Sequence, residues 1–323
     1  MTDLRLSCCF RTYPYTEAIK SGAIRVPGAV LDFVDVVPQV AAFRRMVRNL
    51  EFDVCELAPT TYMIARAHGV PLIALPVFFV RQFHHAGLLV RADAGIATPK
   101  DLEGKRVGVR AWSVTTGVWK RGILQNEYGV DPAKIRWFVD DEEHVTSLKL
   151  PPCVTQVPEG RSLVQMFAAG ELDAGTAGDA GLGRQGKPEA GWDRGASDPG
   201  VAMHELFPDA DRLHADYFRR TGVLPMHGTL VMKEDLVRDN PGLAEALYEA
   251  FVLARAPYMQ ALADGTATGR QAERDMALAR IVGDPLPYGL KANRASIAML
   301  IRYATQQGLL PAGVTPEDMF LAL

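Results

Sequence analysis

Hydroxyl-bearing residues stand at the starts of two predicted helices, each shortly after an apolar segment. The apolar segments are Phe52–Leu57 and Arg106–Val109. The hydroxyl groups are those of Thr60, Thr61, Thr115 and Thr116. The first turn of a helix leaves backbone N–H groups without intrahelical partners, and the helix dipole adds partial positive charge there. Each segment therefore predicts a place where a carboxylate or a phosphate could bind.

Helix capping is the alternative role for these hydroxyl groups. Thr60 and Thr116 could act as ordinary N-caps, a role worth about 1 kcal/mol of stability. Capping and ligand binding are compatible, so both interpretations stay open. Two such units in different parts of one chain favour two lobes that direct helix N-termini at one small anion.

The composition limits the classes of protein to consider. The chain has 323 residues, which exceeds one compact core and suits two lobes. Its net charge of −3 argues against nucleic acid or an anionic membrane as a main partner. No segment has the unbroken apolar length of a membrane span. The first residues lack the features of a secretory signal, so we expect a cytoplasmic protein. The oligomeric state is left open.

The cysteines give no sign of a metal centre. They are Cys8, Cys9, Cys55 and Cys153, and no two of them form a CxxC pair. We expect buried, reduced thiols and no zinc site built on them.

The hydrophobic pattern predicts alternating strands and helices. The expected strands span residues 3–10, 30–37, 52–57, 72–79, 86–91, 106–109, 136–139 and 225–232. The expected helices span residues 40–49, 60–68, 116–127, 162–170, 241–262, 269–282, 293–307 and 316–323. Residues 178–200 should form a surface loop, and the acidic run Asp140–Glu143 a solvated turn rather than a metal site.

This alternation predicts an α/β protein with two mostly parallel sheets and flanking helices. Lobe one is expected to comprise residues 1–90 plus 228–323, and lobe two residues 91–227. We expect a hinged clamp with its ligand in the cleft between the lobes. The layout resembles the type II periplasmic-binding-protein fold, and the segments Pro99–Val109 and Phe167–Ala174 are typical of that superfamily.

Several further segments, spread in order over nearly the whole chain, resemble one family on that fold. They span residues 56–62, 76–85, 119–124, 127–130, 226–227, 284–289 and 293–294. Together they are similar to the 4,5-dihydroxyphthalate decarboxylase family. The chain matches this family at Arg11, Glu56, Arg81, His85, Thr116 and His227.

The chain also departs from the family pattern. Cys9-Phe10 stands where the family tends to have Tyr-Asp, and His84 stands where it often has Arg. Ala58 and Ala111 replace a serine and an acidic residue, and Ala86 replaces another serine. A shared scaffold with a different substrate would explain these departures.

The resemblance implies the non-oxidative decarboxylation of a hydroxylated aromatic acid such as 4,5-dihydroxyphthalate. This reaction needs a proton at the ring carbon that bears the carboxylate, and electron donation from a phenolate. A histidine can move that proton because its pKa lies near working pH. The expected catalytic residues are His85, His227 and Glu56. The expected substrate-binding residues are Arg11, Thr60, Thr61, Arg81, His84, Arg110, Thr115 and Thr116.

Several of these residues have structural alternatives. His84 and His85 on one strand would point to opposite faces, so at most one would be functional. His227 could be a hinge residue bound to backbone, and Arg81 could pair with Glu56.

Metal binding is another alternative, although we expect no cofactor. Glu56, His84, His85 and His227 offer oxygen and nitrogen ligands for zinc or manganese, but their spacing is not diagnostic.

The expected partner is a small aromatic carboxylate. The competing function is a non-catalytic binding protein for a small organic anion, either the solute receptor of a transporter or a cytoplasmic sensor.

Overall fold

The structure is a computed structural model that describes residues 3–184 and 199–323. The chain forms two compact units, each described here by itself. Unit 1 comprises residues 1–82, 218–301 and 313–323, and unit 2 comprises residues 83–217 and 302–312. The sequence placed the lobe limits near residues 90 and 227, and it did not predict that residues 302–312 belong with the second unit.

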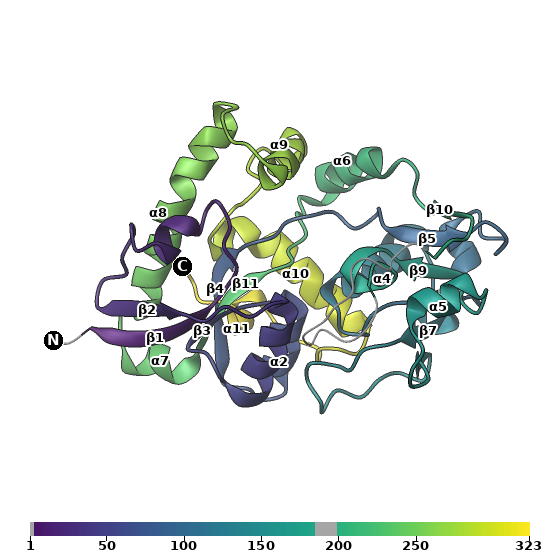
Figure 1. Cartoon of the computed structure of the whole chain (residues 1–323), viewed down its shortest axis with the longest axis horizontal. Helices are drawn as coiled ribbons and strands as arrows, with labels where there is room; N and C mark the ends of the chain where they lie inside the picture. The colour runs from purple at the N-terminus through teal and green to yellow at the C-terminus, as the bar shows by residue number, and fades with distance from the viewer. Residues whose placement is uncertain (1–2, 185–198) are drawn as a thin grey trace. The chain divides into compact units, whose positions relative to one another are not determined.

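Unit 1 is built on a five-stranded sheet (Figure 1). Its strands are β1 (Leu4–Cys9), β2 (Ala29–Phe33), β3 (Val54–Leu57), β4 (Leu72–Phe78) and β11 (Thr229–Lys233). The spatial order is β2-β1-β3-β11-β4. Strand β1 pairs in parallel with β2 and β3, whereas β11 is antiparallel to both β3 and β4. A strand from the end of the chain therefore separates two strands that are close in sequence.

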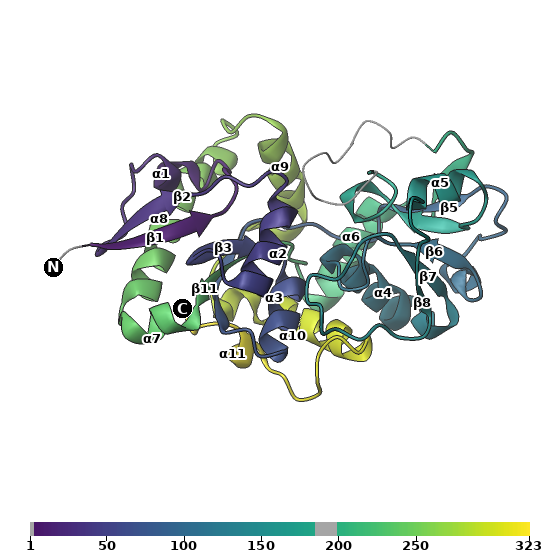
Figure 2. The same ribbon diagram turned by 60° about the horizontal axis from the view of Figure 1, so that its bottom comes forward.

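Helices of unit 1 pack on this sheet or on one another. They are α1 (Glu17–Lys20), α2 (Gln39–Asn49), α3 (Pro59–Ala67), α7 (Glu234–Asp239), α8 (Leu243–Ala263), α9 (Arg270–Val282), α10 (Leu290–Gln306) and α11 (Pro316–Met319). Helix α2 packs next to β3 (Figure 2), and both α3 and α8 pack next to β4. Every residue of β3 and β4 is buried, as expected for strands covered on both faces. Leu6, Val77, Leu230 and Phe251 lie in the core between sheet and helices.

Unit 2 contains a six-stranded mixed sheet in the order β10-β5-β9-β6-β7-β8. Its strands are β5 (Leu88–Arg91), β6 (Arg106–Gly108), β7 (Arg136–Val139), β8 (Val154–Gln156), β9 (Ala174–Thr176) and β10 (Met203–Glu205). Its helices are α4 (Thr115–Tyr128) and α5 (Leu163–Ala168), with short 3₁₀ turns η1 (Pro99–Leu102), η2 (Pro132–Lys134) and η3 (Gly178–Ala180). Helix α6 (Ala210–Thr221) contributes residues to both units, as does α10.

Two mixed sheets, one in each unit and each with flanking helices, confirm the predicted fold class. Several boundaries differ from the prediction. Strand β2 ends at Phe33, and the strand expected from residue 225 begins only at Thr229. The sequence pattern missed β8, β9 and β10, which have three residues each, and the short helices α1 and α7. It also missed α6, of which only Tyr217 is fully buried. Most of the loop expected at 178–200 lies outside the described residues.

The four cysteines are free thiols. Cys8, Cys9 and Cys55 are buried and Cys153 is partly exposed, so the prediction of buried thiols holds for three of them. Cys9 and Cys55 are register partners on the adjacent strands β1 and β3.

Candidate functional site

One edge of the first sheet brings together most of the predicted residues of unit 1. Arg11 follows β1, Glu56 lies near the end of β3, and the segment containing Arg81 follows β4. His227 lies just before β11, whose amino end meets the carboxyl ends of its neighbours because β11 runs antiparallel to them. Ligands of open α/β sheets bind at the carboxyl ends of the strands. We therefore take this edge as the candidate site of unit 1.

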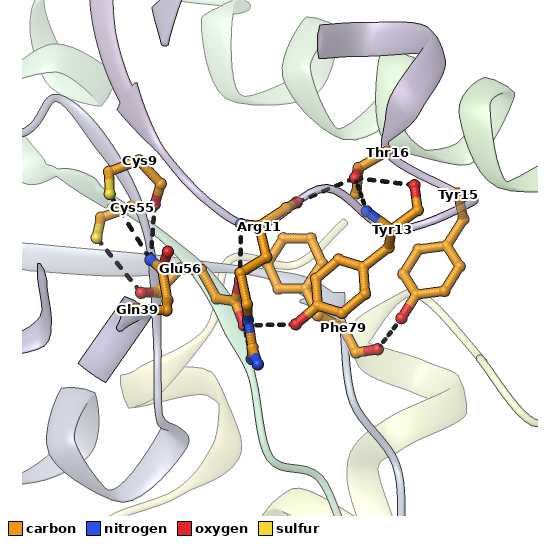
Figure 3. Close-up of polar contacts among 9 residues, drawn as sticks. All are labelled: Cys9, Arg11, Tyr13, Tyr15, Thr16, Gln39, Cys55, Glu56 and Phe79. Carbon is orange, nitrogen blue, oxygen red and sulfur yellow. Dashed lines mark hydrogen bonds and ion pairs between the residues drawn. The ribbon is translucent and has the colours of Figure 1, made fainter. Parts of the chain in front are cut away.

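Arg11 and Glu56 form the central ion pair of this edge (Figure 3). The backbone N–H of Arg11 donates to Oε2 of Glu56 at 3.1 Å, and its Nε donates to Oε1 at 3.1 Å. Nη2 of Arg11 also donates to Oε1. The hydroxyl of Tyr13 donates to the same Oε1 at 2.9 Å, and the Arg11 guanidinium lies 5.2 Å from the Tyr13 ring centre. Glu56 is thus bound by donors on both of its oxygens.

The electrostatics keep the Arg11 guanidinium charged. Burial disfavours the Arg11 cation, but the Glu56 carboxylate outweighs that cost and raises the pKa of Arg11 above its usual range. Burial and the same carboxylate raise the pKa of Tyr13, so its phenol stays neutral and donates. Glu56 has no exposed surface, whereas 47% of the Arg11 side chain is exposed. An incoming anion would therefore meet the guanidinium, with the carboxylate behind it.

His227 lies on the same edge of the sheet, because it directly precedes β11, which pairs with the strand that carries Glu56. Its backbone N–H donates to the carbonyl of Val80 at 2.8 Å, and its ring Nε2 lies 3.2 Å from Nε2 of Gln82. A Cβ placed on the following residue, Gly228, would lie 3.1 Å from Oε1 of Glu56. The half-buried His227 therefore directly precedes a close neighbour of Glu56, namely Gly228, where little space is left for a side chain.

Arg81 occupies a different environment from the one considered in the sequence. Its Nη1 donates to the carbonyl of Leu224 at 3.0 Å, and its Nη2 donates to the carbonyl of Pro287 at 3.1 Å and to Oδ1 of Asn293. Arg81 is buried, and burial lowers its pKa. The pairing of Arg81 with Glu56 is wrong, because Arg11 takes that place. Arg81 instead fixes residues just before His227.

The threonines open the first turns of their helices rather than cap them. Helix α3 begins at Pro59 with Ala58 at the N-cap, and α4 begins at Thr115 with Val114 at the N-cap. The N-cap interpretation of Thr60 and Thr116 is therefore wrong. Thr60, Thr61 and Thr115 are buried, and Thr116 is half-buried. All four remain at helix starts, where the sequence placed them.

In unit 2, a carboxylate of the chain already binds the loop before α4. Glu143 accepts hydrogen bonds from the backbone N–H groups of Trp112 at 2.7 Å and Ser113 at 3.2 Å. Nη1 of Arg110 lies 3.8 Å from Oδ2 of the buried Asp141. The expectation of a solvated turn at Asp140–Glu143 is wrong: only Glu142 of this run is exposed. The run supplies carboxylates to Arg110 and to the loop amides.

His84 and His85 lie in a bend before β5, not on a strand. Both are buried, so the expected alternation of one inward and one outward ring is wrong. The His84 ring stacks on Trp119 with centres 6.2 Å apart. The His85 ring contacts three others, those of Phe207, His214 and Tyr217, with centre distances of 5.9, 5.4 and 5.6 Å.

Sequence reasoning missed several residues that shape these sites, namely Tyr13, Lys120, Glu143 and Glu205. Lys120 carried a usable signal, since it stands with Arg121 inside the otherwise apolar helical segment 117–124. The others bind groups 30 or more residues away in the chain and had no local signal.

The described part of the chain contains no cluster of three or more His, Cys, Asp or Glu side chains suited to a metal ion. Within residues 3–184 and 199–323, no helix has both the length and the apolar character needed to cross a bilayer. The cytoplasmic location stays a prediction.

Comparisons with known proteins define the class of the fold. A family model described as an ABC transporter, phosphonate, periplasmic substrate-binding protein matches residues 33–187. The crystal structure of the periplasmic aliphatic sulphonate binding protein SsuA from Escherichia coli is similar with a TM-score of 0.52 and 14% identity. That similarity covers 99% of this chain and 92% of the other. The protein therefore has the type II periplasmic-binding-protein fold.

Sequence relatives define the family within that fold. A 4,5-dihydroxyphthalate decarboxylase from Comamonas testosteroni is 32% identical over 338 residues, which cover 99% of this chain and 97% of the relative. One from Pseudomonas putida is 34% identical over 182 residues, covering 54% of this chain and 70% of the relative. The chain belongs to the 4,5-dihydroxyphthalate decarboxylase family, as its motifs predicted.

Proposed function

We propose that the protein decarboxylates, without oxidation, a hydroxylated aromatic acid such as 4,5-dihydroxyphthalate. Membership of the family supports the reaction class. The observation that carries the proposal is the Arg11–Glu56 pair, in which a buried carboxylate holds a half-exposed guanidinium at the carboxyl edge of a sheet.

Arg11 binds a carboxylate of the substrate in this proposal. A guanidinium recognises a carboxylate through two parallel hydrogen bonds and stays charged at any working pH. Glu56 is fully buried and bound by Arg11 and Tyr13, so we assign it to positioning Arg11 rather than to proton transfer. The N-terminal turn of α3, with Thr60 and Thr61, supplies polar groups at the same sheet edge. Substrate contacts of Arg81, His84, Arg110, Thr115 and Thr116 stay predictions.

His227 is the proposed proton donor. A phenolate ortho or para to the reacting carbon pushes electron density into the ring, and that carbon takes the proton. The bond to the carboxylate then breaks, its electron pair returns to the ring, and CO2 leaves. His227 suits this step because its ring is only half-buried and lies at the edge that carries Arg11. His85 is the second candidate, for removal of the phenol proton.

The direct test is turnover. The purified protein is incubated with 4,5-dihydroxyphthalate and a panel of hydroxybenzoates, and released CO2 and the aromatic product are measured. We expect stoichiometric CO2 from at least one acid, and its loss in Arg11→Gln. Tight binding without CO2 from any acid would reject the proposal.

A non-catalytic binding protein is the second candidate, favoured by the fold shared with a sulphonate binding protein. It predicts that an organic anion raises the melting temperature without chemical change. It also predicts that His227→Gln alters affinity alone.

A further inference from the structure

Two charged side chains fix the backbone of the bend that carries the two histidines of unit 2. Lys120, from α4, donates through Nζ to the carbonyl of His84 at 3.2 Å and to the carbonyl of Ala86. Glu205, from β10, accepts through Oε2 from the backbone N–H groups of Gly87 at 2.9 Å and Leu88 at 3.2 Å. The carbonyl of Gly87 accepts from the N–H of Ala177 at 2.9 Å. The backbone of residues 84–88 is thus held by a series of hydrogen bonds.

Lys120 is an unusual residue for this position. It is 6% exposed, in the middle of a helix whose neighbouring side chains are also buried. A lysine is almost never fully buried unless a partner compensates its charge. Burial lowers the pKa of Lys120 to about 7, although nearby Glu205 opposes the shift. The observed role of the Lys120 Nζ group is to donate hydrogen bonds to the carbonyl oxygens of His84 and Ala86.

Gly87 allows the tight turn beside the lysine. Its φ of +74° is a conformation that residues with a side chain rarely adopt, whereas a Cβ there would make only an ordinary contact, 3.6 Å from Nζ of Lys120. The tight turn, Lys120 and Glu205 therefore form one arrangement, which we call the Lys120–Glu205 clamp.

The clamp sets where the histidine rings lie. Lys120 holds the carbonyls of the residues immediately before and after His85. The His85 ring then fits among the aromatic side chains of Phe207, His214 and Tyr217. Residue Trp119, the chain neighbour of Lys120, stacks on the ring of His84. Two neighbouring residues of α4 thus contact both the backbone and the ring of His84.

We propose that Lys120 and Glu205 are positioning residues, which hold residues 84–88 so that His85 keeps one orientation during the reaction. The proposal deepens the proposed function and rests on it for the role of His85. A site held by its supporting residues keeps the geometry that catalysis needs, and a displacement of about 1 Å can cost about 10²-fold in rate.

Hydrogen exchange tests the clamp without reference to activity. Lys120→Met keeps the length and apolar stem of the side chain and removes its donors. We expect exchange of the amides within residues 83–91 to quicken about tenfold or more, with unit 1 unchanged. The matched control is Lys134→Met, because Lys134 is an exposed lysine of the same unit, with 62% side-chain exposure. Unchanged exchange in residues 83–91 of Lys120→Met would overturn the clamp.

Kinetics test the link to the reaction. We expect Lys120→Met to lower kcat about 10²-fold with a smaller change in KM, since the clamp orients His85, whereas Arg11, which binds the substrate carboxylate in the proposed function, lies in unit 1. A loosened bend with unchanged kcat would overturn the positioning role. Glu205→Gln, which keeps an acceptor for Gly87 and Leu88, should show the same pattern more weakly and serves if Lys120→Met fails to fold. If the wild-type protein turns over no acid, the proposed function fails, and hydrogen exchange alone decides the clamp.

Discussion

Arg11 and Glu56 form an ion pair whose partners meet opposite surroundings: 47% of the Arg11 side chain is exposed, and none of Glu56 is. A negative charge buried without compensation is costly, so the pair and the Tyr13 hydroxyl must stay together in the folded state. The arginine is thereby held in one orientation before any ligand arrives. Preorganisation of this kind lowers the entropic cost of binding an anion.

Removal of the buried charge should weaken both stability and binding. Glu56→Gln keeps the size of the side chain but leaves the donors of Arg11 and Tyr13 with a poorer acceptor. We expect a loss of about 1 to 3 kcal/mol in the free energy of unfolding by urea denaturation, and weaker aromatic acid binding by calorimetry. Glu51→Gln is the control, since Glu51 pairs with Arg45 at the surface and should cost less than about 1 kcal/mol. Equal losses in both variants would contradict this account.

Gly228 should be sensitive to one added methyl group. A Cβ there would lie 3.1 Å from Oε1 of Glu56, so the Glu56 carboxylate would have to give way by a few tenths of an ångström. We expect Gly228→Ala to fold and to bind the aromatic acid about tenfold more weakly, a penalty of roughly 1.4 kcal/mol. Because the methyl group acts through Glu56, its effect should shrink in a Glu56→Gln background. Strictly additive effects in the double variant would count against the mechanism.

The sequence could predict which residues reach the sheet edge but not which of them pair. Arg11 and Glu56 pair because β1 and β3 are neighbours, with Cys9 opposite Cys55. Arg81 follows β4, and β11 is inserted between β4 and β3. Local periodicity says nothing of where a strand 150 residues further on will pair. The order of the strands therefore decided between two arginines that the sequence could not distinguish.

The histidine bend shows a second limit. The apolar run from Ala86 predicts a strand, and β5 does follow at Leu88. Lys120 and Glu205 hold the residues just before it as a turn, which Gly87 permits through its positive φ. Partners this distant override the local preference for a strand. A glycine two residues after His85 was the available sign of the turn.

His214 should make the protein less stable in mild acid. Burial lowers its pKa from 6.5 to about 4, so between these values the unfolded chain binds more protons than the folded one. Stability then falls as pH decreases from about 6.5 towards 4. His214→Phe keeps a ring against that of Phe83, whose centre lies 5.0 Å from the His214 ring centre. The free energy of unfolding, measured with urea, should then differ between pH 7 and pH 5 by about 1 kcal/mol less than in the wild type. His204→Phe, at an exposed histidine, should leave that difference unchanged, and a wild-type slope in His214→Phe would contradict the assignment.

His227 separates the two candidate functions most sharply. His227→Gln keeps a polar side chain near Gln82 but cannot deliver a proton at neutral pH. If His227 is the proton donor, CO2 release should fall about 10² to 10⁴-fold while the dissociation constant of the acid changes less than about tenfold. The control is His68→Gln, at the exposed end of α3, which should leave both quantities unchanged. Wild-type turnover in His227→Gln would move proton transfer to another residue, with His85 the next to test. A loss of affinity that matches the loss of turnover would instead place His227 among the groups that bind the acid.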